Sequence, residues 1–372
     1  MIQGRYWRRE RARRFLASTY LGRYLAFNEP TDHDQSRMPQ RRISASPQAA
    51  PTPKAARERD LSQLMVTPRR GAPQQPLSRL FTESGSTAIV VLHESVASAL
   101  VGLAISEGAI DSVDAPIGRW LPDLQDPRAR ELTLAHLLEM RSGIRFTEGM
   151  FPWNDEPRTY YATDLRARLL GLPVVDPLAA FFPLQRLASA LAFARPRACH
   201  RQDDYRTPAT ADLEPAGAEH PASIMVDRSG PSGLEHLECG LTATARDLAK
   251  FGQLFLQDGM WNGRRLLPAR WVDSTTSPAA ARSDAAWFDY YRERPWGRVL
   301  STGRYFYGRM WWGNRLETGG YDFFAMGVLG QHVHVSPDTA TVIVRLSSCF
   351  PPGMWWAPVL RAMALATAGR SD

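Results

Sequence analysis

Residues 95–143 read SVASALVGLAISEGAIDSVDAPIGRWLPDLQDPRARELTLAHLLEMRSG, and the expected fold is built outward from this stretch. Its first part has apolar side chains at Val96, Leu100 and Ala104, a spacing that places them on one face of a helix. Gly108 follows at a point where glycine commonly ends a helix. The stretch therefore predicts a helix that begins near residue 95 and stops at Gly108.

The second part of this stretch predicts another helix. The sequence LTLAHLLEM follows residue 131, with Thr133 as its N-terminal capping residue. Ser142 and Gly143 come next, and we expect the helix to continue up to them.

Composition and charge limit the possible functions. The chain has 372 residues, of which 44% are hydrophobic and 22% charged, as in soluble globular proteins of one large or two smaller domains. The net charge of +7 comes almost wholly from arginine, because Lys54 and Lys250 are the only lysines. Apart from RRERARR at 8–14, the arginines are scattered and no recognition motif accompanies them, so we expect no nucleic-acid partner.

Cysteine usage and hydropathy indicate the compartment. Cys199, Cys239 and Cys349 have no paired spacing, which is typical of a reducing environment. The N-terminus lacks the apolar core of a signal peptide, and no apolar run is long enough for a membrane span. We therefore expect a cytoplasmic protein without a membrane partner, and the sequence does not indicate its oligomeric state.

The chain divides into an N-terminal arm with a Pro- and Arg-rich wrap, residues 1–80, and a domain over residues 81–372. In the domain, STAIVVL at 86–92 is a β-branched apolar run that predicts a strand of the central sheet. It is followed at once by the first predicted helix.

The C-terminal half predicts further elements. A helix begins after Thr244, with Asp247 three residues on as in a capping box, and Gly259 lies just beyond its end. Residues 331–346 alternate about a turn at Ser-Pro-Asp and predict a hairpin, and a last helix is expected from 356 to 367. Strands at both ends with helices between them favour an α+β fold with an antiparallel sheet flanked by helices.

Three segments carry a resemblance to a known family: SALVGLAISEG at 98–108, SVDAPIGRWLPDL at 112–124 and LTLAHLLEMRSGI at 132–144. They resemble the serine β-lactamase-like hydrolases, which include class C β-lactamases, DD-peptidases and related esterases, and above all the 6-aminohexanoate-dimer hydrolase branch. The resemblance implies a β-lactamase/transpeptidase-like fold and hydrolysis of a small-molecule amide or ester through an acyl-serine. It implies no cofactor and no metal.

The family motif S-x-x-K is missing from this chain. When the segments are aligned, the family's nucleophilic serine falls on Val91 and its lysine on Glu94. The two lysines of the chain follow Pro51 and Asp247 at the required distance, so S-x-x-K occurs nowhere. Comparison with the family pattern also predicts the loss of one strand, directly after residues 86–92, and of one helix, between residues 213 and 217.

Other site residues follow from the resemblance alone. Tyr205 stands at the family's tyrosine, a general acid/base, but the loss of the lysine favours the alternative that it is a tyrosine in a rebuilt loop with no partner. Gly327 and Val328 are candidates for the strand that donates backbone N–H groups to the oxyanion, or belong to a plain edge strand. Trp153 lies in a segment similar to the substrate-side loop, or is a surface aromatic that packs the loop.

Ser95 and Ser98 lie on the same helix and are candidate substitute nucleophiles, of which Ser95 is the nearer to the missing motif. Ser95 lies one helical turn, about 5.4 Å, beyond the position of the family's serine. Efficient catalysis tolerates far less displacement of the attacking oxygen. His332 and His334 would point to one face of a strand, where we expect a solvated surface and no metal, since a third ligand is lacking.

Together these features predict a β-lactamase-related serine hydrolase by descent that is inactive or strongly impaired. A hydroxyl is a weak nucleophile until an adjacent base takes its proton, and the family's base is absent here. Three alternatives stay open: a non-catalytic ligand-binding protein on the same fold, a truncated or decayed gene product, and an enzyme in which Ser95 is a relocated nucleophile.

Overall fold

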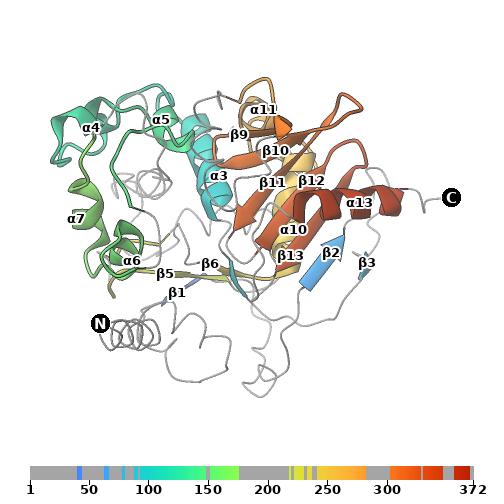
Figure 1. Cartoon of the computed structure of the whole chain (residues 1–372), viewed down its shortest axis with the longest axis horizontal. Coiled ribbons are helices and arrows are strands. Elements are labelled where there is room, and N and C mark those ends of the chain that lie inside the picture. The colour runs from blue at the N-terminus through green and yellow to red at the C-terminus, as the bar shows by residue number, and fades with distance from the viewer. Residues whose placement is uncertain are drawn as a thin grey trace, which may run out of the picture.

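A computed structural model describes residues 40–43, 63–66, 78–79, 88–90, 93–147, 151–175, 218, 222–229, 233–236, 241–281, 302–327, 330–346 and 356–368. Its helices and antiparallel strands form an α+β fold around a seven-stranded sheet, as the sequence predicts (Figure 1). The strand order is β3-β2-β13-β12-β11-β10-β9. The bounds are β2 Gln63–Val66, β3 Ser78–Arg79, β9 Tyr305–Gly308, β10 Trp311–Arg315, β11 Tyr321–Gly327, β12 Gln331–Ser336 and β13 Thr341–Leu346.

The predicted hairpin and last helix are confirmed. β12 pairs with β13 from His332 opposite Arg345 to Ser336 opposite Thr341. The final helix, α13, spans Trp356–Ala368. Val333 and Val335 of β12 point into the main hydrophobic core.

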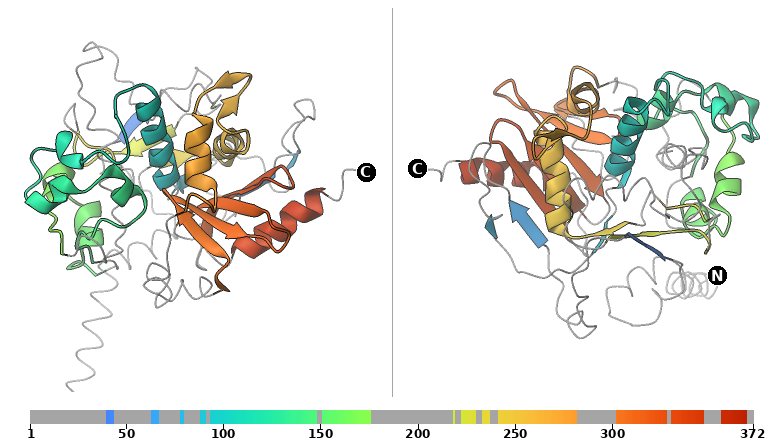
Figure 2. Two further views of the ribbon diagram at one scale, coloured as in Figure 1. Left: turned by 90° about the horizontal axis from the view of Figure 1, so that it is seen from above. Right: turned by 180° about the vertical axis from the view of Figure 1, so that it is seen from behind.

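Two helices cover opposite faces of the large sheet (Figure 2). Helix α10, Ala245–Leu256, packs on β12, β13 and β2, whereas α13 packs on the other face of β12 and β13. Helix α10 begins as predicted, because the Thr244 hydroxyl accepts a hydrogen bond from the Asp247 N–H. Its buried residues include the predicted apolar stripe of Leu248, Phe251, Leu254 and Phe255.

A second sheet holds the strand that precedes the first helix. This sheet has the order β1-β5-β6-β4, with β1 Gln40–Ile43, β4 Ala88–Val90, β5 Ala222–Met225 and β6 Leu241–Ala243. The prediction that residues 86–92 belong to the central sheet is therefore wrong, because β4 pairs with β6. A two-stranded hairpin, β7 Met260–Trp261 and β8 Arg264–Arg265, follows α10.

Helix α3, His93–Ser106, lies between the large sheet and a group of short helices (Figure 1). It ends at Gly108, where φ is +73° and the Ala109 N–H donates to the Ala104 carbonyl. The short helices are η3 Ile117–Arg119, α4 Pro127–Glu131, α5 Leu134–Leu138, α6 Asp155–Tyr160 and α7 Leu165–Leu170, and α11 Ala269–Thr276 follows later in the chain.

Helix α5 is shorter than the sequence predicts. Thr133 is its N-cap, as expected, but the helix stops at Leu138 instead of at Ser142. Met140 has a φ of +55°, a left-handed conformation that ends the helix early. Nothing in the residue type of Met140 signals this turn, since methionine is a good helix former.

The N-terminal region contributes strands to both sheets. Strands β2 and β3 of the large sheet and β1 of the small sheet all come from residues 1–80. β2 pairs directly with β13, from Ile343 opposite Val66 to Leu346 opposite Gln63.

Candidate active site

The sequence assigns the missing nucleophile to Val91, just before α3, and the missing lysine to Glu94, in the first turn of α3. Val91 lies outside the described residues, and Glu94 lies half-buried in this turn. Ser95 is 2% exposed, and its hydroxyl donates a hydrogen bond of 2.7 Å to the carbonyl oxygen of Met310. The Ser95 proton is thus held by a backbone carbonyl, which is not a base.

The acceptor of this bond belongs to the tight turn between β9 and β10. Gly308 pairs with Trp311, so Arg309 and Met310 are the two turn residues, with φ values of +37° and +74°. Both are in the left-handed region, which costs a residue with a Cβ about 1–2 kcal/mol. A turn of this kind persists only where its surroundings hold it.

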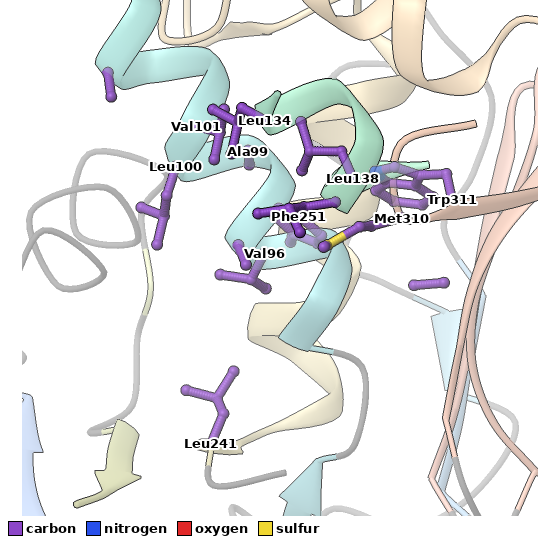
Figure 3. Close-up of a cluster of buried hydrophobic side chains, with 14 of the residues drawn as sticks. Val96, Ala99, Leu100, Val101, Leu134, Leu138, Leu241, Phe251, Met310 and Trp311 are labelled. Atoms are coloured by element: carbon purple, nitrogen blue, oxygen red, sulfur yellow. The ribbon is translucent and has the colours of Figure 1, made fainter. Parts of the chain in front are cut away.

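Side chains from three elements surround this turn. The Met310 side chain is buried beside Phe251 and Leu138 (Figure 3). The Arg309 guanidinium donates to Ser274 Oγ at 3.0 Å and lies 3.4 Å from the Glu139 carboxylate. It also lies over the Trp271 ring. These contacts join α5, α10 and α11 to the large sheet, and sequence reasoning missed all of them.

Ser98 is one turn further along α3 and is completely buried. Its hydroxyl has no hydrogen-bond partner within the described residues. Neither Ser95 nor Ser98 is placed where a substrate carbonyl could reach it from solvent.

The structure does not bring the other predicted site residues together. Tyr205 and Val328 lie outside the described residues. Gly327 is the last residue of β11 and pairs with Gln331 of β12. Trp153 is 64% exposed and stacks in parallel on Phe151, with the ring centroids 4.8 Å apart.

The expected solvated surface at His332 and His334 is wrong. Both rings are buried on the face of β12 that α13 covers, where they flank the Phe324 ring. Sequence alternation places them on one face, as predicted, but cannot tell that a later helix covers that face. Within the described residues, no group of three or more His, Cys, Asp or Glu residues could hold a metal ion.

One carboxylate of the helical region has a strongly shifted pKa. The side-chain hydrogen bond from Arg128 is the largest cause that lowers the pKa of Asp126 from 3.8 to about 2, and backbone N–H donors add to it. One of these donors is Val174, 48 residues away, at 2.9 Å. Asp126 therefore caps α4 and ties it to the strand-like segment at Val174, a structural role and not a catalytic one.

Comparison with known proteins shows a family match over part of the chain. Residues 95–182 match the beta-lactamase family. The chain thus contains a segment of a beta-lactamase family domain. The matched segment of this domain starts at Ser95, directly after the positions onto which the missing serine and lysine fall.

Relatives extend the match beyond this segment. The chain is 25% identical over 277 residues to the 6-aminohexanoate-dimer hydrolase of Paenarthrobacter ureafaciens, covering 70% of this chain and 65% of that protein. The chain thus spans slightly less than two thirds of that relative's length.

Solved structures share the fold of this beta-lactamase family domain. A protein assigned as a 6-aminohexanoate-dimer hydrolase from Bacillus anthracis superposes with a TM-score of 0.61 at 19% identity, over 86% of this chain and 82% of that one. A penicillin-binding protein homologue from Caulobacter crescentus gives 0.54 at 15% identity, over 77% and 86%. The predicted β-lactamase/transpeptidase-like fold is therefore confirmed. No helix among the described residues is both long and apolar enough to cross a membrane.

Proposed function

We propose that this chain is a relative of the 6-aminohexanoate-dimer hydrolases that does not hydrolyse amides or esters through an acyl-serine. The observation that carries the proposal is the state of Ser95, the one substitute nucleophile that the sequence offers near the missing motif. Its hydroxyl is buried and bonded to the Met310 carbonyl.

Acyl transfer imposes two requirements that Ser95 does not meet. The attacking oxygen must come within about 3–3.5 Å of the substrate carbonyl carbon, which needs an open approach. An adjacent base must also accept its proton. The peptide carbonyl of Met310 cannot accept that proton, and breaking the bond to it would leave a buried acceptor unpaired.

A second candidate function is non-catalytic binding of a small amide or ester. The exposed, parallel pair of Phe151 and Trp153 supports it, because rigid aromatic rings provide apolar contact area at low entropic cost. The neighbouring backbone is fixed by reciprocal bonds: the Thr147 N–H donates to the Asp155 carboxylate, and the Asp155 N–H donates to the Thr147 carbonyl.

The experiment is intact-mass analysis of the purified chain after incubation with a fluorophosphonate, alongside hydrolysis of a nitrophenyl ester and of the linear 6-aminohexanoate dimer. A serine hydrolase that contains S-x-x-K is the positive control. We expect no adduct and no turnover from protein that unfolds cooperatively. A stoichiometric adduct with turnover would contradict the proposal, and its loss in Ser95→Ala would identify the nucleophile.

Two further readings of the same sample separate the alternatives. Calorimetry with the 6-aminohexanoate dimer tests the binding role, with Trp153→Ala as the matched variant that should lose binding. A broad, uncooperative unfolding transition would instead support the decayed gene product, because a domain that lacks a strand leaves backbone groups unpaired.

A further inference from the structure

A buried set of charged side chains lies between the large sheet and α13, away from the candidate active site. Asp322 of β11 is 0% exposed, and His334 of β12 is 1% exposed. The Nε2 atom of His334 lies 3.3 Å from Oδ2 of Asp322. Neither of these two atoms has a hydrogen-bond partner within the described residues, and neither does Nδ1 of His334.

Helix α13 contributes one cation to this set. The Arg361 guanidinium lies 3.3 Å from Oδ1 of Asp322 and donates to Ser336 Oγ at 2.7 Å. It also donates to both carboxylate oxygens of Asp338, in the turn between β12 and β13, at 2.5 and 2.6 Å. The hydrogen bond from Arg361 is the largest cause that lowers the pKa of Asp338, so this carboxylate stays ionised at neutral pH.

The order of the groups is His334, Asp322, Arg361, Asp338. With a neutral imidazole, two carboxylates share one guanidinium, and the buried Asp322 is only partly compensated. With a protonated imidazole the charges of these four groups alternate in sign and sum to zero. A buried charge is strongly unfavourable unless it is paired. Protonation of His334 therefore compensates the buried Asp322 carboxylate, which the neutral ring leaves only partly compensated.

The other charged groups near His334 do not supply the missing positive charge. Arg345 of β13 donates to the Gly330 carbonyl at 2.6 Å, and its guanidinium lies 3.7 Å from the centre of the Trp356 ring. His332 lies opposite Arg345 in the strand pairing and next to Phe324. Phe324 also stacks on His334, at 5.9 Å between centroids, and the face of an aromatic ring attracts a cation at this distance.

We propose that His334 is a proton-binding site that couples the docking of α13 to pH, with the protonated ring holding the helix more firmly on the sheet. The proton enters at a ring nitrogen, and Nε2–H then donates to Oδ2 of Asp322. Burial opposes this charge, because it removes water from the imidazolium. The Asp322 carboxylate, 3.3 Å from Nε2, and the Phe324 ring favour the protonated ring and offset this cost of burial.

The sign of the effect follows from the geometry. A contact made by the protonated ring is present at low pH and is lost as the pH rises through the range in which histidine titrates, about pH 5–8. Docking of α13 should therefore strengthen from pH 8 to pH 5.5.

The experiment is hydrogen exchange of the full chain, read at the amides of residues 356–368 and expressed as protection factors, which removes the intrinsic pH dependence of exchange. We expect the protection factors of α13 to rise roughly three- to tenfold between pH 8 and pH 5.5. His334→Gln should abolish the rise. His332→Gln, on the same strand face, is the matched control and should keep it.

A second measurement covers the case in which His334→Gln does not fold. In the wild-type chain labelled with ¹³C-histidine, the His334 ring resonance should move between pH 8 and pH 5.5, the range of the exchange experiment, together with the amide shifts of α13. A resonance that does not change over this range would overturn the proposal. Protection of α13 that stays level or falls as the pH falls to 5.5 would overturn it too, as would an undiminished rise in His334→Gln.

Discussion

Replacement of Ser95 by alanine tests whether this serine is structural. The substitution removes the donor to the Met310 carbonyl, which lies in a buried turn. A buried acceptor left without its partner costs about 1–3 kcal/mol. Alanine recovers about 0.5 kcal/mol as the better helix former. We therefore expect Ser95→Ala to lower the free energy of unfolding by about 0.5–2.5 kcal/mol.

The same helix offers a matched control. Ser106 also donates to a backbone carbonyl at 2.7 Å, that of Leu103, but this bond is exposed. The Leu103 carbonyl keeps a second donor, the Glu107 N–H at 2.9 Å, so it stays satisfied after substitution. Ser106→Ala should change the free energy of unfolding by less than about 0.5 kcal/mol.

Urea unfolding at neutral pH measures both variants. The difference between them should appear as a shift of the transition midpoint with an unchanged slope, because the surface exposed on unfolding is the same. Equal stabilities of Ser95→Ala and Ser106→Ala would refute the reasoning, since the Met310 carbonyl would then not depend on Ser95.

Two further substitutions test the packing and the pH dependence. In Gly252→Ala on α10, the new Cβ would lie 2.6 Å from Val342 Cγ1 and 2.8 Å from Val333 Cγ1, so overpacking of about 1–3 kcal/mol should outweigh a helix-propensity gain of about 1 kcal/mol. Thermal unfolding measures this, and a more stable variant would contradict the close approach of α10 to the sheet. Asp126 has a folded-state pKa of about 2, below its ordinary 3.8, so its stabilisation is present above about pH 4 and is lost as the pH falls to 2. Asp126→Asn should lower the free energy of unfolding at pH 7 by about 1 kcal/mol, a value reduced for solvent screening because Arg128 is largely exposed. It should also weaken the fall in stability of the protein between about pH 4 and pH 2. A fall identical to that of the wild type would show that this carboxylate contributes nothing.

Local signals in the sequence predicted the regular elements well. Helix α10 has an N-cap threonine and an apolar stripe, and the β12–β13 hairpin has strict alternation about a turn, so each is specified by neighbouring residues. The end of α5 depends instead on Met140 in a left-handed conformation, which residue type does not signal. Elements set by tertiary contacts were therefore the ones predicted incorrectly.

The candidate site shows the same limit at the level of single side chains. Periodicity predicts that His332 and His334 share a face of their strand. Whether solvent reaches that face depends on α13, which begins more than 20 residues later in the sequence. Motif spacing shows that S-x-x-K is missing, yet the role of Ser95 depends on Met310, which lies 215 residues away. Such partners are fixed by packing and leave no local pattern in the sequence.

The position of β2 beside β13 has a consequence for how the chain is made. Residues 63–66 pair on one side with β3, nearby in the sequence, and on the other side with residues 343–346 of β13. During synthesis, β2 therefore emerges some 280 residues before β13, so the pairing that joins it to the rest of the central sheet forms late. Contacts this distant in sequence close slowly, because the loop between them loses much entropy. Until then β2 can pair only with β3, and the Pro- and Arg-rich sequence around these two strands favours the solubility of this early segment.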